Sequence, residues 1–266
     1  MPISIEARFS FRLPEPGDVL LQFEAAGIPE QRLITAETRF SDGCKIARIA
    51  AEEDIGERIW LRGEGVVEVE HRAEVAVTRL TPDIAALAAL SHHALPGETV
   101  RYLFDSRYCP ADSFQSFVQA EFEGTSGGAR IAAIRDWIAE KFSYEPGSST
   151  SATTARDSFV ERRGICRDYA HVLVTLARAS AIPARFVSAY APGVEPPDFH
   201  AVAEVFLADS TGGKGGAWYP ADATGMADPA QLVKIGVGRD AADVSFLTSF
   251  AICEFLDKSV SASVTG

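Results

Sequence analysis

A glycine followed directly by a long apolar run with helical spacing constrains the fold of this chain more than any other feature. In the segment Arg162–Ala179, Gly164 is typical of a tight turn that leads into a helix. Apolar residues then recur at intervals of three and four, which is the period of one helical face. They comprise Ala170, Leu173, Val174 and Ala177. The pattern predicts a buried helix with Cys166 in its first turn.

The position of Cys166 at the start of a helix has a chemical consequence. The unpaired N–H groups and the positive end of the helix dipole favour the thiolate, which is the nucleophilic form of cysteine. The same N–H groups can face the oxyanion that develops during acyl transfer. A buried structural cysteine would explain this position equally well, because free cysteine is among the most buried residue types. The helix alone leaves both interpretations open.

A histidine and an acid follow Cys166 in an order that favours catalysis. The run His200–Leu207 predicts a buried strand, whose first residue lies beside a loop rich in proline and glycine. The strand would fix the imidazole while the loop leaves one face open. A neighbouring strand is predicted to end at Asp222, whose carboxylate could hold the second ring nitrogen of His200. The three residues have the order of a Cys-His-Asp triad.

Other polar residues near these positions offer alternatives. Glu204 lies an even number of residues after His200, so the strand period places it on the same face as a second candidate for the orienting acid. Asp168 fits a helix cap better than a catalytic role, because the dipole stabilises a carboxylate there. Helical rotation turns His171 away from the face of Cys166, which favours a structural role.

Two further groups of residues remain open. Tyr144 and Tyr169 are the candidates for a second oxyanion donor. Arg239, Asp240 and Asp243 either line a cleft or form ion pairs, and the sequence does not separate these roles.

The first part of the chain predicts antiparallel β structure. Apolar and polar residues alternate over Ile5–Leu13 and again over Val67–Val77, which is the period of a strand with one buried face. Several further short strands separated by turn residues predict a β-sandwich or an antiparallel sheet. The pattern changes near Thr81, so we expect an N-terminal β domain of residues 1–80 and a second unit of residues 81–266.

Two segments of the second unit have a clear prediction of their own. Ile131, Ile134, Ile138 and Phe142 recur at helical spacing, which predicts an amphipathic helix over 129–142. The C-terminal tail, Lys258–Gly266, consists of small and polar residues and is expected to fray.

The charge content argues against several classes of partner. The chain carries 25 Lys and Arg residues against 37 Asp and Glu residues, a net charge of −12, and has no dense basic run. Nucleic acids and anionic membrane surfaces are therefore not expected as partners. The acidity is only a weak hint of a cationic or neutral substrate.

Apolar runs and cysteine spacing bear on location and cofactors. No apolar run approaches the ~20 residues of a membrane helix, and the first residues lack the basic and apolar regions of a secretory signal, so a cytoplasmic location is expected. The four cysteines are far apart, which argues against a disulfide framework and against a zinc site. We expect neither a metal nor a cofactor.

Four linked blocks of the sequence resemble the transglutaminase-like superfamily, and more narrowly the bacterial proteins described as transglutaminase-like enzymes or candidate cysteine proteases. The blocks are Gly164-x-Cys166-x-Asp168-Tyr169-Ala170, Ala181-Ile182-Pro183-Ala184-Arg185, Phe199-His200-Ala201-x-Ala203-Glu204-Val205 and Trp218-x-Pro220-x-Asp222-x-Thr224. The match is tight from Ala129 to Thr224. In the last block Ala223 takes the place of a proline that follows the acid in many relatives.

The resemblance implies a fold and roles for the three residues. It implies an α+β protein with a papain-like transglutaminase core, in which a helix bearing the cysteine packs on an antiparallel sheet bearing the histidine and the acid. A β-sandwich-like N-terminal domain precedes this core. Cys166 is then the nucleophile, His200 the base and acid, and Asp222 the orienting residue.

These roles predict thiol acyl transfer on a peptide or protein substrate. Cys166 would attack a peptide or carboxamide carbonyl, His200 would protonate the leaving amine, and water or an amine would resolve the thioester. We expect hydrolysis, as in a peptidase or amidase, because most single-chain bacterial relatives are regarded as peptidases and no calcium-loop pattern is present.

The alternatives are transglutaminase-type amine transfer, a binding module without turnover, and an arylamine acetyltransferase, for which we find no acyl-CoA region. The substrate and the oligomeric state are not predicted.

Overall fold

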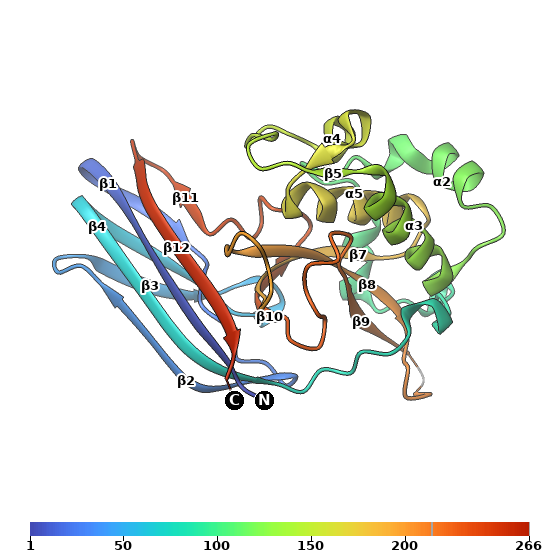
Figure 1. The fold of residues 1–266 in the computed structure, drawn as a ribbon, viewed down its shortest axis with the longest axis horizontal. Helices are drawn as coiled ribbons and strands as arrows, with labels where there is room; N and C mark the ends of the chain where they lie inside the picture. Colours follow the sequence, from blue (N-terminus) through green and yellow to red (C-terminus); the bar gives the residue numbers. More distant parts are fainter. Residues whose placement is uncertain (214, 266) are drawn as a thin grey trace.

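Alternating apolar and polar residues build the long antiparallel strands of the first part of the chain. The computed structural model describes residues 1–213 and 215–265 (Figure 1); Lys214 and Gly266, within the predicted second unit, lie outside them. Strands β1 (Ile3–Leu21) and β4 (Glu57–Val77) pair along almost their whole length. Strands β2 (Gln31–Phe40) and β3 (Lys45–Ala50) both pair with β4.

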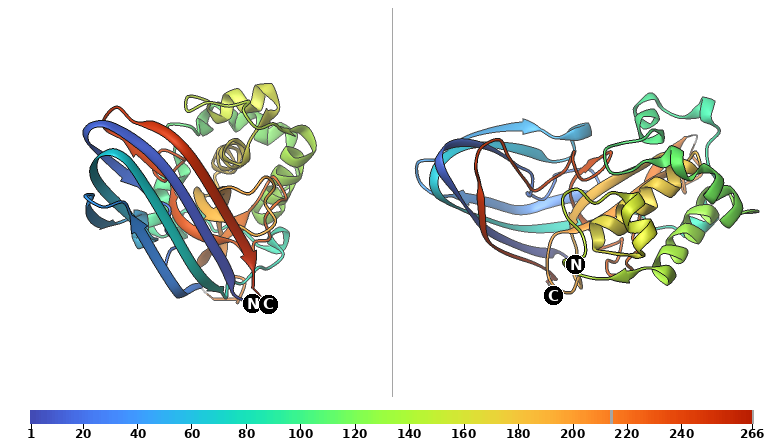
Figure 2. Two further views of the ribbon diagram at one scale, coloured as in Figure 1. Left: turned by 60° about the vertical axis from the view of Figure 1, so that its left-hand side comes forward. Right: turned by 90° about the horizontal axis from the view of Figure 1, so that it is seen from above.

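The sheet bends strongly, which gives the N-terminal part its sandwich-like core. The pairing register of β1 with β4 shifts between Leu13 and Gly17. The strands curve there, as Figure 2 shows, and apolar residues from both halves of the sheet share one core. Phe9 in the first half meets Phe23 beyond the second half with ring centroids 5.0 Å apart. One bent sheet therefore provides the packing that two separate sheets provide in a sandwich.

The end of the chain returns to this first sheet. Strands β11 (Leu247–Ser249) and β12 (Glu254–Val264) both pair with β1, so that six strands form the sheet within the described residues. The expectation that the tail frays is wrong up to Val264, because the open edge of β1 satisfies its backbone hydrogen bonds. The predicted unit of residues 81–266 is therefore not separate from the predicted 1–80 domain, because its last strands, β11 and β12, extend the sheet of that domain.

A second antiparallel sheet carries the later part of the chain. Its strand order is β10-β7-β8-β9. The strands are β7 (Ala184–Tyr190), β8 (His200–Ala208), β9 (Gly216–Ala221) and β10 (Val233–Gly238). Helix α5 (Cys166–Ala179) lies on β7 and β8, and its buried residues join those of the sheet in one core. A cysteine-bearing helix on an antiparallel sheet confirms the predicted α+β fold.

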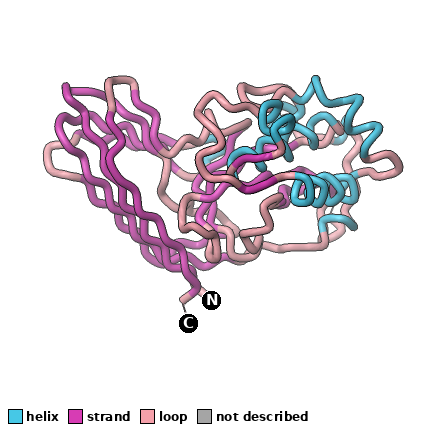
Figure 3. The backbone as a smooth tube through the Cα atoms, turned by 45° about the horizontal axis from the view of Figure 1, so that its top comes forward, coloured by secondary structure: helices cyan, strands magenta, loops and turns pink. Residues whose placement is uncertain are grey.

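The remaining helices pack around α5 on the side away from the first sheet, where Figure 3 shows helices gathered at one end of the molecule. They are α2 (Gln115–Glu121), α3 (Gly127–Lys141) and α4 (Ala155–Glu161). Helix α3 agrees with the predicted 129–142 segment. The short elements are α1 (Gly97–Val100), β5 (Ser143–Tyr144), β6 (Arg163–Gly164), η1 (Glu52–Asp54), η2 (Ile84–Ala86), η3 (His92–Ala94), η4 (Arg101–Leu103) and η5 (Ala111–Phe114).

The two sheets are joined by an apolar core and by buried charges. Ile3, Ile5 and Val75 of the first sheet pack with Tyr190 and Val233 of the second. The Tyr190 hydroxyl donates a hydrogen bond of 2.6 Å to the carbonyl of Phe23.

None of the helices in the described residues is long and apolar enough to cross a membrane.

Candidate active site

The start of α5 is built by a glycine and a buried carboxylate. A Cβ at Gly164 would lie 2.5 Å from the Cβ of Asp168, so only glycine lets the chain pass this close. Asp168 is buried, and its carboxylate accepts a hydrogen bond of 2.9 Å from the N–H of Ile165. This contact confirms the predicted cap. Cys166 is the first residue of the helix, where backbone N–H groups have no helical partner.

His200 and Asp222 lie together across the second sheet. His200 begins β8, and Asp222 directly follows the last residue of β9. His200 Nε2 and Asp222 Oδ2 are joined by a hydrogen bond of 2.9 Å. The Asp222 carboxylate also accepts bonds from the N–H and hydroxyl of Thr224 and from the N–H of Ala227, at 2.7–2.9 Å. Burial opposes its charge, but these donors hold the pKa of Asp222 below its ordinary value.

Cys166 lies close to this imidazole. Its Sγ is 4.0 Å from the carbonyl oxygen of Phe199, the residue before His200. His200 Nδ1 has no hydrogen-bond partner within the part of the chain that the structure describes. Burial opposes the charge on the ring, yet the bond to Asp222 and the nearby Cys166 thiol outweigh burial and raise the pKa of His200 to about 9. The structure therefore brings the three predicted residues together.

The alternative acid, Glu204, does not contact His200. Its side chain is fully buried and forms ion pairs with Arg185, at 2.6 Å, and with Lys234. Burial opposes its charge, but the two cations hold the pKa of Glu204 well below its ordinary value. Of the two acids, Asp222 is thus the one that is hydrogen-bonded to the imidazole.

His171 has a structural position, as predicted. It is fully buried, and its Nε2 accepts a hydrogen bond of 3.1 Å from the N–H of Ala241. Its ring stacks on Tyr108 with centroids 5.1 Å apart. Burial lowers the pKa of His171 to about 3, so the ring is neutral.

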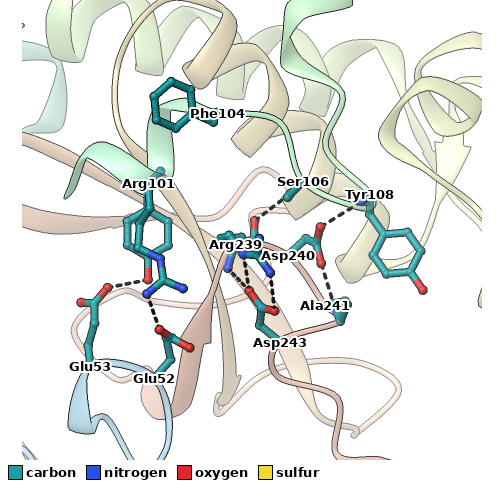
Figure 4. Close-up of polar contacts among 12 residues, drawn as sticks. Glu52, Glu53, Arg101, Phe104, Ser106, Tyr108, Arg239, Asp240, Ala241 and Asp243 are labelled. Carbon is teal, nitrogen blue, oxygen red and sulfur yellow. Dashed lines mark hydrogen bonds and ion pairs between the residues drawn. The ribbon is translucent and has the colours of Figure 1, made fainter. Parts of the chain in front are cut away.

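The segment after β10 contains an ion pair and a buried carboxylate that accepts backbone hydrogen bonds, both visible in Figure 4. Arg239 pairs with Asp243 at 3.0 Å. Asp240 is buried, and its two carboxylate oxygens accept hydrogen bonds of 2.9 Å from the N–H groups of Tyr108 and Ala242. Of the two roles that the sequence left open, Arg239 and Asp243 form an ion pair, and none of the three residues lines the cleft described below. Asp240 instead joins two segments that do line it.

The cleft measures about 620 Å³ and lies where the second sheet meets the first. Cys166 and His200 line one wall, and Tyr144 and Phe199 lie beside them. The facing residues include Thr248 of β11 and Lys258 of β12. The sequence analysis missed Lys258, because no local pattern indicates that the last strand of the chain returns to the nucleophile.

Of the two tyrosine candidates, only Tyr144 lies in the cleft. Burial raises the pKa of Tyr144 to about 12, and the neighbouring Cys166 thiol adds to the rise, whereas a hydrogen bond with the Cys166 backbone lowers it. The hydroxyl therefore stays protonated near Cys166. Tyr169 instead packs in the core between the helices and the second sheet.

Comparisons with known proteins agree with this architecture. Residues 117–223 match the family model of the transglutaminase-like superfamily. The crystal structure of a protein from Cytophaga hutchinsonii, described as a candidate cysteine protease, superposes with a TM-score of 0.91. The two proteins are 28% identical, and the match covers 99% of this chain and 90% of that one.

Curated relatives match a shorter stretch. A Mycobacterium leprae protein described as uncharacterised is 31% identical over 126 residues, which is 44% of this chain and 42% of the relative. A Mycobacterium tuberculosis protein with the same description is 32% identical over 128 residues, which is 43% of this chain and 40% of the relative. The chain thus spans about two fifths of the length of these relatives. Residues 117–223 thus form a transglutaminase-like domain, and the fold of the whole chain is similar to that of the Cytophaga hutchinsonii protein.

Proposed function

We propose that this chain is a thiol acyl-transfer enzyme that hydrolyses peptide or carboxamide bonds, with Cys166, His200 and Asp222 as its catalytic residues. One observation carries the proposal. The imidazole of His200 is fixed by Asp222 at 2.9 Å in the wall of a cleft that also contains the thiol of Cys166. The likeness to the Cytophaga hutchinsonii protein described as a candidate cysteine protease supports hydrolysis of a peptide or protein substrate.

Each of the three residues has a step in the proposed reaction. The Cys166 thiolate attacks the carbonyl carbon, and His200 then donates a proton to the leaving amine, so that a thioester remains. Water attacks the thioester after giving a proton to His200, and the acid product leaves with Cys166 restored. Asp222 holds the imidazole orientation and stabilises the imidazolium throughout.

Tyr144 is our choice for the second oxyanion donor. The backbone N–H of Cys166 supplies the first donor, because it lies in the first turn of α5. The Tyr144 hydroxyl lies near both this N–H and the thiol, and it remains protonated at neutral pH. Two donors on one side of the nucleophile would stabilise the charge that develops on the substrate oxygen.

Alkylation with iodoacetamide at mildly acidic pH tests the Cys166–His200 pair. Mass spectrometry of the wild type should show fast labelling of Cys166 and slow labelling of the other three cysteines. Burial raises the pKa of Cys44, Cys109 and Cys253, so their thiols stay protonated. The His200→Ala variant should lose the selectivity.

The outcome decides between an enzyme and a binding module. If Cys166 reacts no faster than an ordinary thiol and is indifferent to His200, the enzyme proposal fails. If labelling is selective, turnover of a peptide library with and without an added primary amine separates hydrolysis from amine transfer, because the amine product has a different mass. The cytoplasmic location stays a prediction.

A further inference from the structure

Among the described residues, Asp198 is the acid that lines the cleft, and Asp168 and Asp222 each contact a residue of the lining. Asp198 pairs with Lys258 at 2.6 Å, and Asp168 pairs with Arg167 at 3.0 Å. Asp222 is bonded to His200. These acids are therefore compensated inside the protein, and they leave no free negative charge to attract a cationic substrate.

Arg107 differs from these residues because its charge is not compensated. It lines the same cleft as Cys166, and its side chain is exposed to solvent. No ion pair joins it to a carboxylate of any residue that the structure describes. Its guanidinium carbon lies 5.0 Å from the ring centroid of Tyr108. Among the described residues, the Arg and Lys side chains that line the cleft are Arg107, Arg167 and Lys258, and only Arg107 has no acidic partner. The net charge of the chain is −12.

The backbone beside Arg107 is firmly held. The N–H of Tyr108 donates to the buried carboxylate of Asp240, as Figure 4 shows, and its hydroxyl donates to the carbonyl of Ser151 at 2.8 Å. The Tyr108 ring also stacks on the buried His171. Because Tyr108 is fixed in this way, the backbone of the preceding residue, Arg107, is held at a defined place. A defined position of the backbone is a requirement for selective binding by the side chain.

We infer that Arg107 selects substrates that carry a carboxylate next to the scissile amide, such as a peptide with an acidic residue beside the bond. A guanidinium matches a carboxylate through two parallel hydrogen bonds. The walls of a cleft also concentrate the field of a single uncompensated charge. This inference deepens the proposed function and rests on it for the role of Cys166. It replaces the weak hint of a cationic or neutral substrate given by the overall charge.

Two alkylating reagents of the same size test the inference without a known substrate. Iodoacetate is an anion and iodoacetamide is neutral, and the sulfur of Cys166 displaces iodide from either one. We expect the ratio of the iodoacetate rate to the iodoacetamide rate to fall roughly threefold from wild type to Arg107→Gln at low ionic strength. High salt should remove the difference, because it screens exposed charges.

The matched control is Arg32→Gln, which removes one exposed positive charge on β2, outside the cleft. It should leave the rate ratio unchanged, whereas Arg107→Lys should retain most of it. The charge of His200 is common to all variants and cancels in the comparison. An equal ratio in wild type and Arg107→Gln would overturn the inference.

Peptide pairs with Glu or Gln beside the scissile bond distinguish the two proposals. A higher kcat/KM for the Glu peptide that disappears in Arg107→Gln supports both. Turnover of both peptides without a preference for Glu refutes the selectivity for acids and leaves the hydrolase proposal intact. An alkylation ratio that depends on Arg107, without turnover of any peptide, supports the charge selectivity and counts against hydrolysis.

Discussion

The imidazole of His200 is bonded to a carboxylate through one ring nitrogen and has a thiol close by. Asp222 is hydrogen-bonded to Nε2, and both Asp222 and Cys166 raise the pKa of the ring. Burial alone would make such a ring neutral, as it does for His171. The two histidines are both buried and differ in their partners, so the neighbouring groups decide which one can exchange a proton near neutral pH.

The pKa of His200 predicts how stability depends on pH. Its folded value of about 9 is above its ordinary value of 6.5, so the interaction contributes fully below about pH 6.5 and is lost as pH rises through 9. The contribution is on the order of 3 kcal/mol. Urea unfolding of wild type should show this decrease between pH 6.5 and 9, and Asp222→Asn should flatten it. An equally steep profile in the variant would contradict the assignment.

Replacement of Tyr144 by Phe tests the second oxyanion donor. We expect kcat/KM for a peptide substrate to fall by roughly a hundredfold, because one donor to the transition state is lost. The rate of iodoacetamide alkylation should change far less, since alkylation forms no oxyanion. Tyr169→Phe is the matched control, because the Tyr169 ring packs next to Tyr144, with centroids 5.9 Å apart, but does not line the cleft. Equal losses of kcat/KM in both variants would speak against the assignment.

The helix α5 places Cys166 in the cleft, and its first turn depends on two residues that do not line the cleft. Gly164 allows the close approach, and Asp168 fixes the N–H of Ile165. Both act on the backbone that carries Cys166. The sequence block that contains these residues therefore sets the position of Cys166 as well as supplying its thiol.

A comparison of two helix caps tests whether Asp168 positions Cys166. Asp168 caps α5, and Asp157 forms a capping box with Thr154 at the start of α4. Replacing either acid by Ala should lower the free energy of unfolding by about 1 kcal/mol. Only Asp168→Ala should also slow the alkylation of Cys166, because only that cap positions the thiol. Unchanged alkylation in Asp168→Ala would limit its role to stability.

On the scale of the whole molecule, the cleft depends on how two sheets are joined. Strands β11 and β12 carry one side of the cleft on the first sheet, and β8 carries the His200 side on the second. Glu53 of η1 reaches across from the first sheet, pairs with the buried Arg185 at 2.5 Å and accepts a hydrogen bond from the Tyr102 hydroxyl.

Loss of this contact should weaken the joint between the sheets. Glu53→Ala removes two hydrogen bonds and leaves Arg185 with less compensation, so we expect the free energy of unfolding to fall by roughly 3 kcal/mol. Urea denaturation measures the change. Glu37→Ala, at an exposed ion pair with Arg39 on β2, should have little effect. Similar midpoints for wild type and Glu53→Ala would show that the apolar core alone holds the sheets.

The sequence by itself determined the features that depend on near neighbours in the chain. The spacing after Gly164 predicts α5 with Cys166 in its first turn, since a helix repeats every 3.6 residues. Alternation over Ile5–Leu13 predicts the strand that became part of β1. The order of Cys166, His200 and Asp222 indicated a triad that the structure brings together, while their catalytic roles stay a prediction.

Only the tertiary structure decided which distant segments meet. The return of β12 to β1 depends on an edge left open at the other end of the chain, which no local pattern records. The choice of Asp222 over Glu204 depends on the buried cations near Glu204, and the uncompensated charge of Arg107 depends on which acids the other cations neutralise. Strand pairing and charge compensation act through space, so residues far apart in sequence fix them together.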